Sequence, residues 1–315
     1  MGVASLPLIA ATLLAAQTPP PARPTATRIV AITIDDLPVG GATDALRWPA
    51  VTTGILDALR AHRVPAVGFV NEIKLHEAMR LDPARVALLR QWLAAGQELG
   101  NHSFAHVSAH RTTVETFIAH IWRGERVTRP LAQQYRRPLR YFRHPQLHTG
   151  LTLAFKRAVD SALRERGYVV APVTVDNEEW IYAAAFARAR DVGDTALVRR
   201  IVTDYHRHLD TAFAYSEGLS RTLFGREIPL VLLIHANELN AAHLGAVLDR
   251  MAARGYSFVP LSQVLSDSAY RSADQYIGPT GPSWLIRWAE ARGLAVPAEP
   301  RAERYVIDAS GIQGR

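Results

Sequence analysis

Short runs rich in Val, Ile and other strand-forming residues alternate along this chain with longer amphipathic stretches. The short runs predict strands at Arg28–Ile34, Ala66–Val70, Gln97–Gly100, Leu139–Arg143, Tyr168–Val175, Pro229–Ile234 and Ser257–Pro260. The longer stretches predict helices at Pro49–Ala61, Pro83–Ala95, Thr113–Arg126, Leu151–Glu165, Thr195–Thr222, Ala241–Ala253 and Ser283–Arg292. Alternation of this kind implies crossover connections and a mainly parallel sheet. We predict an α/β fold, a distorted (β/α) barrel of about seven parallel strands with helices outside. A doubly wound open sheet is the alternative that periodicity leaves open.

The composition excludes several classes of protein and of site. With 48% apolar and 21% charged residues, the chain has the make-up of a folded globular protein. Its formal net charge is +7, but no block of Lys and Arg is present, so nucleic acid is not an expected partner. The chain has no cysteine, which excludes disulfides, thiolate nucleophiles and Cys-ligated zinc. Any metal must therefore be bound by His, Asp or Glu.

The first residues form a candidate export signal. Gly2–Gln17 is uncharged, and its apolar part is shorter than the ~20 residues that a spanning helix needs. We predict a signal peptide at residues 1–17, a proline-rich spacer at 18–27 and a periplasmic or secreted location. A disordered apolar tail is the alternative, with a cytoplasmic location if the leader is not cleaved. The barrel is predicted over 28–265 and a C-terminal extension packed on it over 266–315. Because no later apolar run reaches membrane length, no stable membrane insertion is expected.

Reactive side chains follow the predicted strands, where (β/α) barrels place their active sites. Asp35 and Asp36 end the first strand, and two adjacent buried carboxylates repel each other unless a cation lies beside them. A turn or helix cap at Asp36 is the plainer reading. His102 and His106 follow the third strand, and this spacing lets two imidazoles bind one metal ion if the segment is helical. Together with one carboxylate they would leave a coordination position open for water, as in catalytic zinc sites.

Later strand ends carry further candidates. These are Arg143, His144, Gln146 and His148 after the fourth strand, Asp176, Glu179 and Trp180 after the fifth, and His235 after the sixth. We expect Arg143 to keep a carboxylate charged by lowering its pKa, and Glu179 or Asp176 to orient and charge His235. Taken singly, Arg143 is also explained by a surface ion pair, Trp180 by a core position and His235 by an ordinary hydrogen-bonded histidine.

The ordered set of motifs resembles the polysaccharide deacetylase family, the NodB-homology carbohydrate esterases. The family motifs T-F-D-D, H-[ST]-x-x-H, R-x-P-Y-G, D-x-x-D-W and L-x-H are similar to Thr33–Asp36, His102–His106, Arg143–Gln146, Asp176–Trp180 and Leu233–His235. Several positions depart from the family pattern: Gln146 stands where Tyr is usual, the glycine comes late, at Gly150, Glu179 replaces Asp, and Ala236 replaces the Asp that often follows the last His. His144 and His148 are additional to the pattern.

The resemblance implies a divalent metal bound by Asp36, His102 and His106, and removal of acetyl groups from amino sugars. One ion per chain is expected, Zn²⁺ first, with Co²⁺, Ni²⁺ or Mn²⁺ as alternatives. The implied base is Asp35 and the implied acid is His235.

The implied supporting roles fall to neighbouring residues. Arg143, Glu179 and Asp176 would assist the base and the acid, and a backbone N–H near Gln146 would stabilise the oxyanion. Trp180, Gln146, His144 and His148 would contact the substrate, with an approach of His144 or His148 to the metal as the alternative. The expected partner is an acetylated saccharide or a small acetamide. An O-acetyl ester or a non-sugar amide cleaved by the same mechanism is one alternative, and an inactive carbohydrate-binding module is the other.

Overall fold

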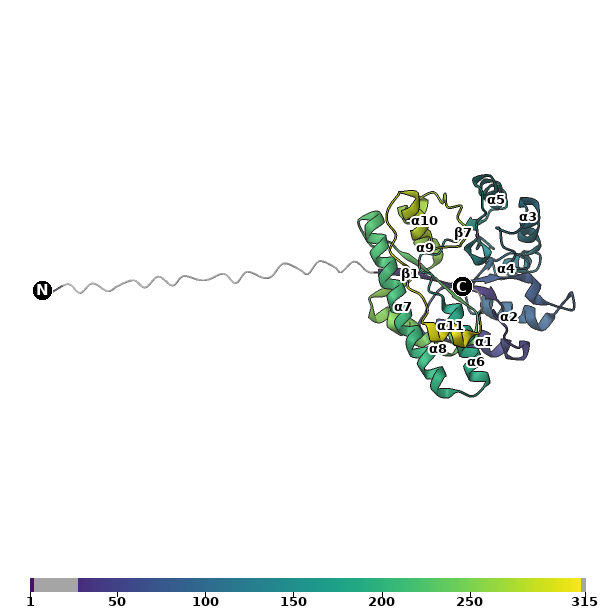
Figure 1. The fold of residues 1–315 in the computed structure, drawn as a ribbon, viewed down its shortest axis with the longest axis horizontal. Coiled ribbons are helices and arrows are strands. Elements are labelled where there is room, and N and C mark those ends of the chain that lie inside the picture. The colour runs from purple at the N-terminus through teal and green to yellow at the C-terminus, as the bar shows by residue number, and fades with distance from the viewer. Residues whose placement is uncertain (3–27, 313–315) are drawn as a thin grey trace.

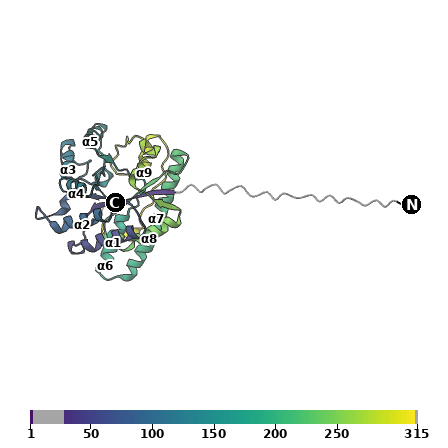
Figure 2. The same ribbon diagram turned by 180° about the vertical axis from the view of Figure 1, so that it is seen from behind.

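A curled, mostly parallel sheet surrounded by helices forms the centre of the molecule (Figures 1 and 2). The computed structural model describes residues 1–2 and 28–312. Within them the main sheet contains β1 (Arg28–Leu37), β2 (Ala66–Val70), β5 (Glu98–Asn101), β6 (Tyr141–Phe142), β7 (Val169–Val170), β8 (Leu230–His235) and β9 (Tyr256–Phe258). The strand order is β7-β6-β5-β2-β1-β8, with β9 beside the start of β1, and every pairing in this sheet is parallel. The predicted α/β class and distorted barrel are confirmed.

The two ends of the sheet meet through an irregular segment rather than a regular strand pair. Beyond β7 the chain crosses to β8, where Val175 forms a parallel bridge with Leu232 and accepts a hydrogen bond from the Leu233 N–H. The predicted strand Tyr168–Val175 is therefore too long. Pro172 has no N–H to donate to a neighbouring strand. Within five residues after the end of β7, the segment changes its hydrogen-bonding partner from β6 to β8.

Helices surround the sheet. They are α1 (Trp48–Ala61), α2 (Pro83–Ala94), α3 (Val114–Arg123), α4 (Thr128–Gln134), α5 (Leu153–Glu165), α6 (Glu179–Asp191), α7 (Thr195–Phe224), α8 (Glu238–Ala253), α9 (Leu261–Leu265), α10 (Trp284–Ala291) and α11 (Arg304–Ser310). Of these, α9 packs against the concave face of the sheet. Short 3-10 turns lie at η1 (Ala45–Arg47), η2 (Glu72–Leu75), η3 (Pro145–Leu147) and η4 (Ser268–Arg271). No helix among the described residues is both long enough and apolar enough to cross a bilayer.

Several elements differ from those predicted. The predicted helix Thr113–Arg126 ends at Arg123, where Gly124 caps it, and α4 follows separately. The sequence pattern did not reveal α6, α11 or the small hairpin of β3 (His76–Glu77) and β4 (Arg80–Leu81). These elements are short or lack a continuous apolar stripe, which is the signal that periodicity depends on. The predicted signal peptide and spacer fall almost entirely on residues 3–27, outside the described residues.

Residues on the two faces of β1 belong to two different apolar clusters. Ile32 and Ile34 pack with the large cluster that includes the covering helices α1 and α8. The opposite, concave face forms a smaller cluster of Ala31, Val67, Phe69, Tyr141, Ala171 and Val231, together with Leu261 and Val264 of α9. Because side chains alternate along a strand, Thr33 and Asp35 share the concave face with Ala31. The interior is thus apolar at the amino ends of the strands and becomes polar at their carboxyl ends.

Candidate active site

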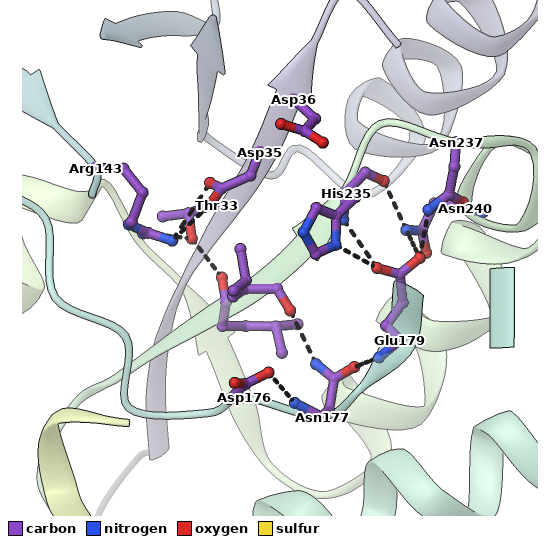
Figure 3. Close-up of polar contacts among 12 residues, drawn as sticks. Thr33, Asp35, Asp36, Arg143, Asp176, Asn177, Glu179, His235, Asn237 and Asn240 are labelled. Carbon is purple, nitrogen blue, oxygen red and sulfur yellow. Dashed lines mark hydrogen bonds and ion pairs between the residues drawn. The ribbon is translucent and has the colours of Figure 1, made fainter. Parts of the chain in front are cut away.

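A buried ion pair stands at the carboxyl end of β1, on the concave face. Asp35 is 2% exposed, and the Arg143 guanidinium, which is fully buried, lies with Nη1 at 3.3 Å from both carboxylate oxygens (Figure 3). Arg143 also donates from Nε to the Ala171 carbonyl and from Nη2 to Thr33 Oγ1. Burial raises the pKa of Asp35, and Arg143 opposes that rise. The expected lowering by Arg143 is therefore present, but burial outweighs it.

Next to this pair, Asp36, His102 and His106 bring three potential metal ligands together. One ligand atom of each lies within 4.8 Å of the other two. Asp36 Oδ1 is 3.8 Å from His102 Nε2 and 3.7 Å from His106 Nε2. The segment that carries the histidines is not helical, although the i, i+4 spacing was expected to bring both imidazoles to one metal ion only in a helix. Positive φ angles at Ser103 (64°) and His106 (53°) turn the chain so that both rings face Asp36.

The donor set fits a divalent cation. Asp36 Oδ1 is buried and accepts no hydrogen bond from the described residues, whereas a buried oxygen normally has a partner. His102 Nδ1 donates to the Arg143 carbonyl at 2.8 Å, which leaves the Nε2 lone pair free toward Asp36. Burial lowers the pKa values of His102 and His106 to about 4, so both imidazoles are neutral at pH 7, as metal ligation requires. Ligand atoms bound to one zinc ion lie about 3 to 4 Å apart, which these distances match.

A cation not anticipated from the sequence lies beside the third ligand. The Lys74 ammonium donates to the Asp36 carbonyl oxygen at 3.0 Å and lies 3.5 Å from Asp36 Oδ2. Burial alone would raise the pKa of Asp36, but Lys74 and the two imidazoles outweigh it and lower that pKa. Asp36 is therefore ionised, with Oδ2 beside Lys74 and Oδ1 directed to the histidines. Lys74 follows the end of β2, and this position was the one available signal for it.

His235 forms a second charged pair on the neighbouring strand. It is the register partner of Asp35 across β1 and β8. His235 Nδ1 lies 2.8 Å from Glu179 Oε2, which also accepts the His235 backbone N–H, while Asn237 and Asn240 donate to Glu179 Oε1 (Figure 3). Burial alone would lower the pKa of His235, but the hydrogen bond and charge of Glu179 raise it to about 9. The imidazolium is thus the form present at neutral pH.

The structure distinguishes between the two carboxylates considered as partners of His235. Glu179 contacts the imidazole, whereas Asp176 Oδ1 accepts a hydrogen bond from the Asn177 N–H. Asn177 in turn donates to the Leu233 carbonyl and accepts the Glu179 N–H, so it fixes the start of α6 against β8. Burial raises the pKa of Asp176. Asp176 lies close enough to His235 and Arg143 for an electrostatic effect.

The four predicted substrate contacts occupy different environments. Gln146 is exposed and has a positive φ of 57°. His144 is buried, stacks on Phe117 and has a pKa lowered by burial to about 3. This position is that of a core histidine rather than an open wall of a pocket. Trp180 is half-buried on α6 and packs against the main apolar cluster.

His148 directly follows η3, in the loop after β6. It is half-buried and stacks on His110 with the ring centroids 3.9 Å apart. Ser108 Oγ accepts the His110 backbone N–H and lies within hydrogen-bond distance, 2.8 Å, of His148 Nδ1. The pKa of His148 is lowered by burial to about 4.

Comparisons with known proteins agree with the motif order. The profile of the family described as polysaccharide deacetylase matches residues 22–171, which include the first three motifs. No curated protein matches the chain. Among solved structures the chain is similar to BA3943, a CE4 family pseudoenzyme from Bacillus anthracis, at 16% identity and a TM-score of 0.51, over 76% of this chain and 66% of that one. A mutant of that protein with restored enzymatic activity is 17% identical, with a TM-score of 0.51, over 76% of this chain and 68% of the mutant. Peptidoglycan deacetylase PdaC from Bacillus subtilis is 20% identical, with a TM-score of 0.47, over 78% of this chain and 94% of PdaC.

At such identities the structural likeness bears on the fold alone. The resemblance to the family depends on the profile match and on the motifs at the ends of β1, β5 and β6. The fourth and fifth motifs lie beyond the matched residues, but their side chains meet those of the first motif at the same end of the sheet. The resemblance predicted from sequence is confirmed: over residues 22–171 the chain is similar to the polysaccharide deacetylase family.

Proposed function

We propose that this chain is a metal-dependent hydrolase that removes acetyl groups from N-acetylated amino sugars or a related envelope saccharide. One observation carries the proposal: an ionised Asp36 with an unpaired Oδ1 faces two neutral imidazoles, and a carboxylate and an imidazolium lie on the adjoining strands β1 and β8. Such a set combines a cation site, a base and an acid at one strand end.

Asp36, His102 and His106 would hold the ion. When bound, a divalent cation supplies Lewis acidity, which polarises a carbonyl and acidifies water. Asp35 accepts the proton of the attacking water. Because burial raises its pKa, this carboxylate is a stronger base than an exposed Asp, and Arg143 fixes its orientation. The oxyanion that develops on the acetyl group is stabilised by the backbone N–H of Gln146.

His235 supplies the proton that the leaving nitrogen needs. At neutral pH it is protonated and held through Nδ1 by Glu179, so Nε2–H remains as the donor. An amine anion is a very poor leaving group, whereas an alkoxide needs less assistance. A strongly held imidazolium therefore favours amide over ester substrates. The buried Asp176 lies close enough to His235 to favour the charged imidazolium electrostatically.

Zn²⁺ is the ion we expect first, with Co²⁺, Ni²⁺ or Mn²⁺ binding the same donors in an order set by affinity and supply. The purified protein should contain about one divalent ion per chain. His102→Ala should abolish metal binding and leave the fold intact, because a catalytic site contributes less to folding than a structural one. His243→Ala on α8 is the control, since His243 lies outside the cluster of ligands. Full metal occupancy in a His102→Ala/His106→Ala variant would contradict the assignment.

Product analysis tests the reaction. The protein is incubated with oligosaccharides of N-acetylglucosamine, and both acetate and new primary amine are measured. Equal amounts of the two support N-deacetylation. Acetate from O-acetylated sugars without new amine would establish an esterase, and no acetate from any substrate by metal-loaded protein would establish an inactive binding module.

Export is proposed from residues 1–17 and the spacer at 18–27. Mass spectrometry of protein from the natural host should find an N-terminus between about Ala16 and Pro24. Recovery of only the intact Met1 form from the cytosol would contradict the periplasmic or secreted location.

A further inference from the structure

The C-terminal part of the chain contacts the loop that follows β6. We call residues 145–149 the β6 loop; it contains η3 and the exposed Gln146. Gly281, from the segment between η4 and α10, packs directly on it. A Cβ atom at Gly281 would lie 2.0 Å from the Gln146 carbonyl oxygen, so only glycine permits this approach.

Arg287 on α10 is the side chain that binds this loop. It is 1% exposed, and its guanidinium donates from Nη2 to the Leu147 carbonyl and from Nη1 to Thr149 Oγ1 at 3.1 Å. It also donates from Nε to the Pro282 carbonyl and from Nη1 to Asp274 Oδ2, and it lies over the Trp284 ring at 4.0 Å. One planar group thus links the C-terminal segment to two successive points of the β6 loop.

The loop has a conformation that must be held in place. Gln146 and Leu147 have φ angles of 57° and 54°, a region that non-glycine residues occupy at a cost in free energy. Within the loop, the Leu147 and His148 amides donate to the His144 and Pro145 carbonyls. The amide of Gln146 is the one proposed above as the oxyanion donor. Its direction depends on the peptide planes that the contacts of Arg287 and Gly281 fix.

The charge of Arg287 is balanced independently of the loop. Asp274 Oδ1 also pairs with the Lys156 ammonium at 2.9 Å, and that ammonium donates to the Tyr276 carbonyl. If Arg287 is replaced, Asp274 keeps one buried cation. A neutral substitution at Arg287 therefore leaves no unpaired buried carboxylate, which is the usual cause of severe destabilisation.

We propose that Arg287 is a positioning residue, which holds the β6 loop so that the Gln146 amide points at the oxyanion. This inference rests on the proposed deacetylase function and extends the catalytic apparatus to the C-terminal segment. A donor that is misplaced by a fraction of an ångström weakens the transition state more than the bound substrate. The effect of Arg287 should therefore appear in kcat rather than in KM.

The test compares Arg287→Met with the matched control Arg292→Met. Arg292 caps the same helix, donates to the Leu223 carbonyl and lies over the Phe224 ring, away from the loop. In Arg287→Met we expect kcat to fall about 10- to 100-fold with KM and metal affinity nearly unchanged. Amide hydrogen exchange should accelerate in a peptide spanning residues 145–149. Arg292→Met should show neither change.

Arg287→Lys keeps the positive charge beside Asp274, but an ammonium cannot reproduce the fork of a guanidinium, so we expect an intermediate loss of kcat. This variant also provides the test if Arg287→Met does not fold. Wild-type kcat and wild-type exchange of the β6 loop in folded Arg287→Met or Arg287→Lys would overturn the proposal. Equal acceleration of exchange across the whole chain would also overturn it, since that indicates a merely structural role. If wild-type protein releases no acetate, the proposed function fails, but the exchange measurement still decides whether Arg287 positions the loop.

Discussion

The hydrogen bonds around Glu179 make the change Glu179→Gln a direct test of the acid. The carboxylate is 2% exposed and accepts four hydrogen bonds: from His235 Nδ1, from the His235 N–H, and from the side-chain amides of Asn237 and Asn240. A glutamine has nearly the same shape but no charge. If its oxygen stays on His235, its NH₂ group faces the two asparagine donors.

The magnitude follows from the pKa of His235, which Glu179 raises to about 9 from an ordinary value of 6.5. Without that charge the pKa should fall back towards about 6.5, since burial lowers it and only the charges of Asp36 and Asp35 still raise it. At pH 8 the protonated fraction drops from about 0.9 to about 0.03, so kcat for an acetamide should fall about 30-fold. At pH 6 the imidazole is mostly protonated in both proteins, and the difference should nearly vanish.

The assay is kcat against pH, from about pH 5.5 to 10, with metal content checked at each point. The wild-type alkaline limb should lie near pH 9 and the variant limb two or more pH units lower. Glu178→Gln is the control, because Glu178 receives the Ala302 N–H and pairs with Arg301 rather than His235. An alkaline limb at the same pH in wild type and Glu179→Gln would refute the assignment of His235 as the acid charged by Glu179.

The pair of His235 and Glu179 also predicts how the stability of the fold depends on pH. The pKa of His235 is higher in the folded protein than in the unfolded chain, so its contribution is fully present below about pH 6.5 and is lost as the pH rises through about 9. The free energy of unfolding of metal-free wild type should exceed that of Glu179→Gln by about 3 kcal/mol at pH 6. Urea titrations should show this difference shrinking towards pH 10, and a difference that grows with pH would contradict the sign.

Further substitutions test the base, the acid and the packing of the helices. Asp35→Asn should lose about 10² to 10⁴ in kcat while keeping its metal, and metal loss would instead make Asp35 a ligand. His235→Ala should lose much more kcat on an acetamide than on an aryl acetate; equal losses would mean that His235 positions rather than protonates. Gly54→Ala should lower the free energy of unfolding by about 1 to 3 kcal/mol, because the new Cβ would lie 2.7 Å from the Ala241 carbonyl oxygen of α8. As its control, Gly245→Ala should be neutral or stabilising in the same urea titration, because the new Cβ would lie 3.6 Å from His62 Cε1, an ordinary van der Waals distance.

The sequence by itself determined the class of fold and the end of the sheet where chemistry occurs. Strand and helix periods are local properties, and they located the strands of the main sheet and most of the long helices. Reactive residues directly after strands must meet in space when the strands are parallel, because carboxyl ends share one edge. That reasoning brings the Asp35–Asp36 pair to the same edge as His102 and His106, and the family resemblance selects Asp36 as the third ligand.

Tertiary structure decided which side chains contact each other. Sequence could not choose between Glu179 and Asp176 as the partner of His235, because the choice depends on how α6 starts against β8. Nor could it show that the His102–His106 segment turns through positive φ angles instead of forming a helix. Lys74 and Arg287 reach the site from a 3-10 turn and from the C-terminal segment, through contacts between residues distant in sequence. Apart from the position of Lys74 after β2, the local sequence pattern does not indicate these contacts, since they arise only when the packed elements bring separate loops to one place.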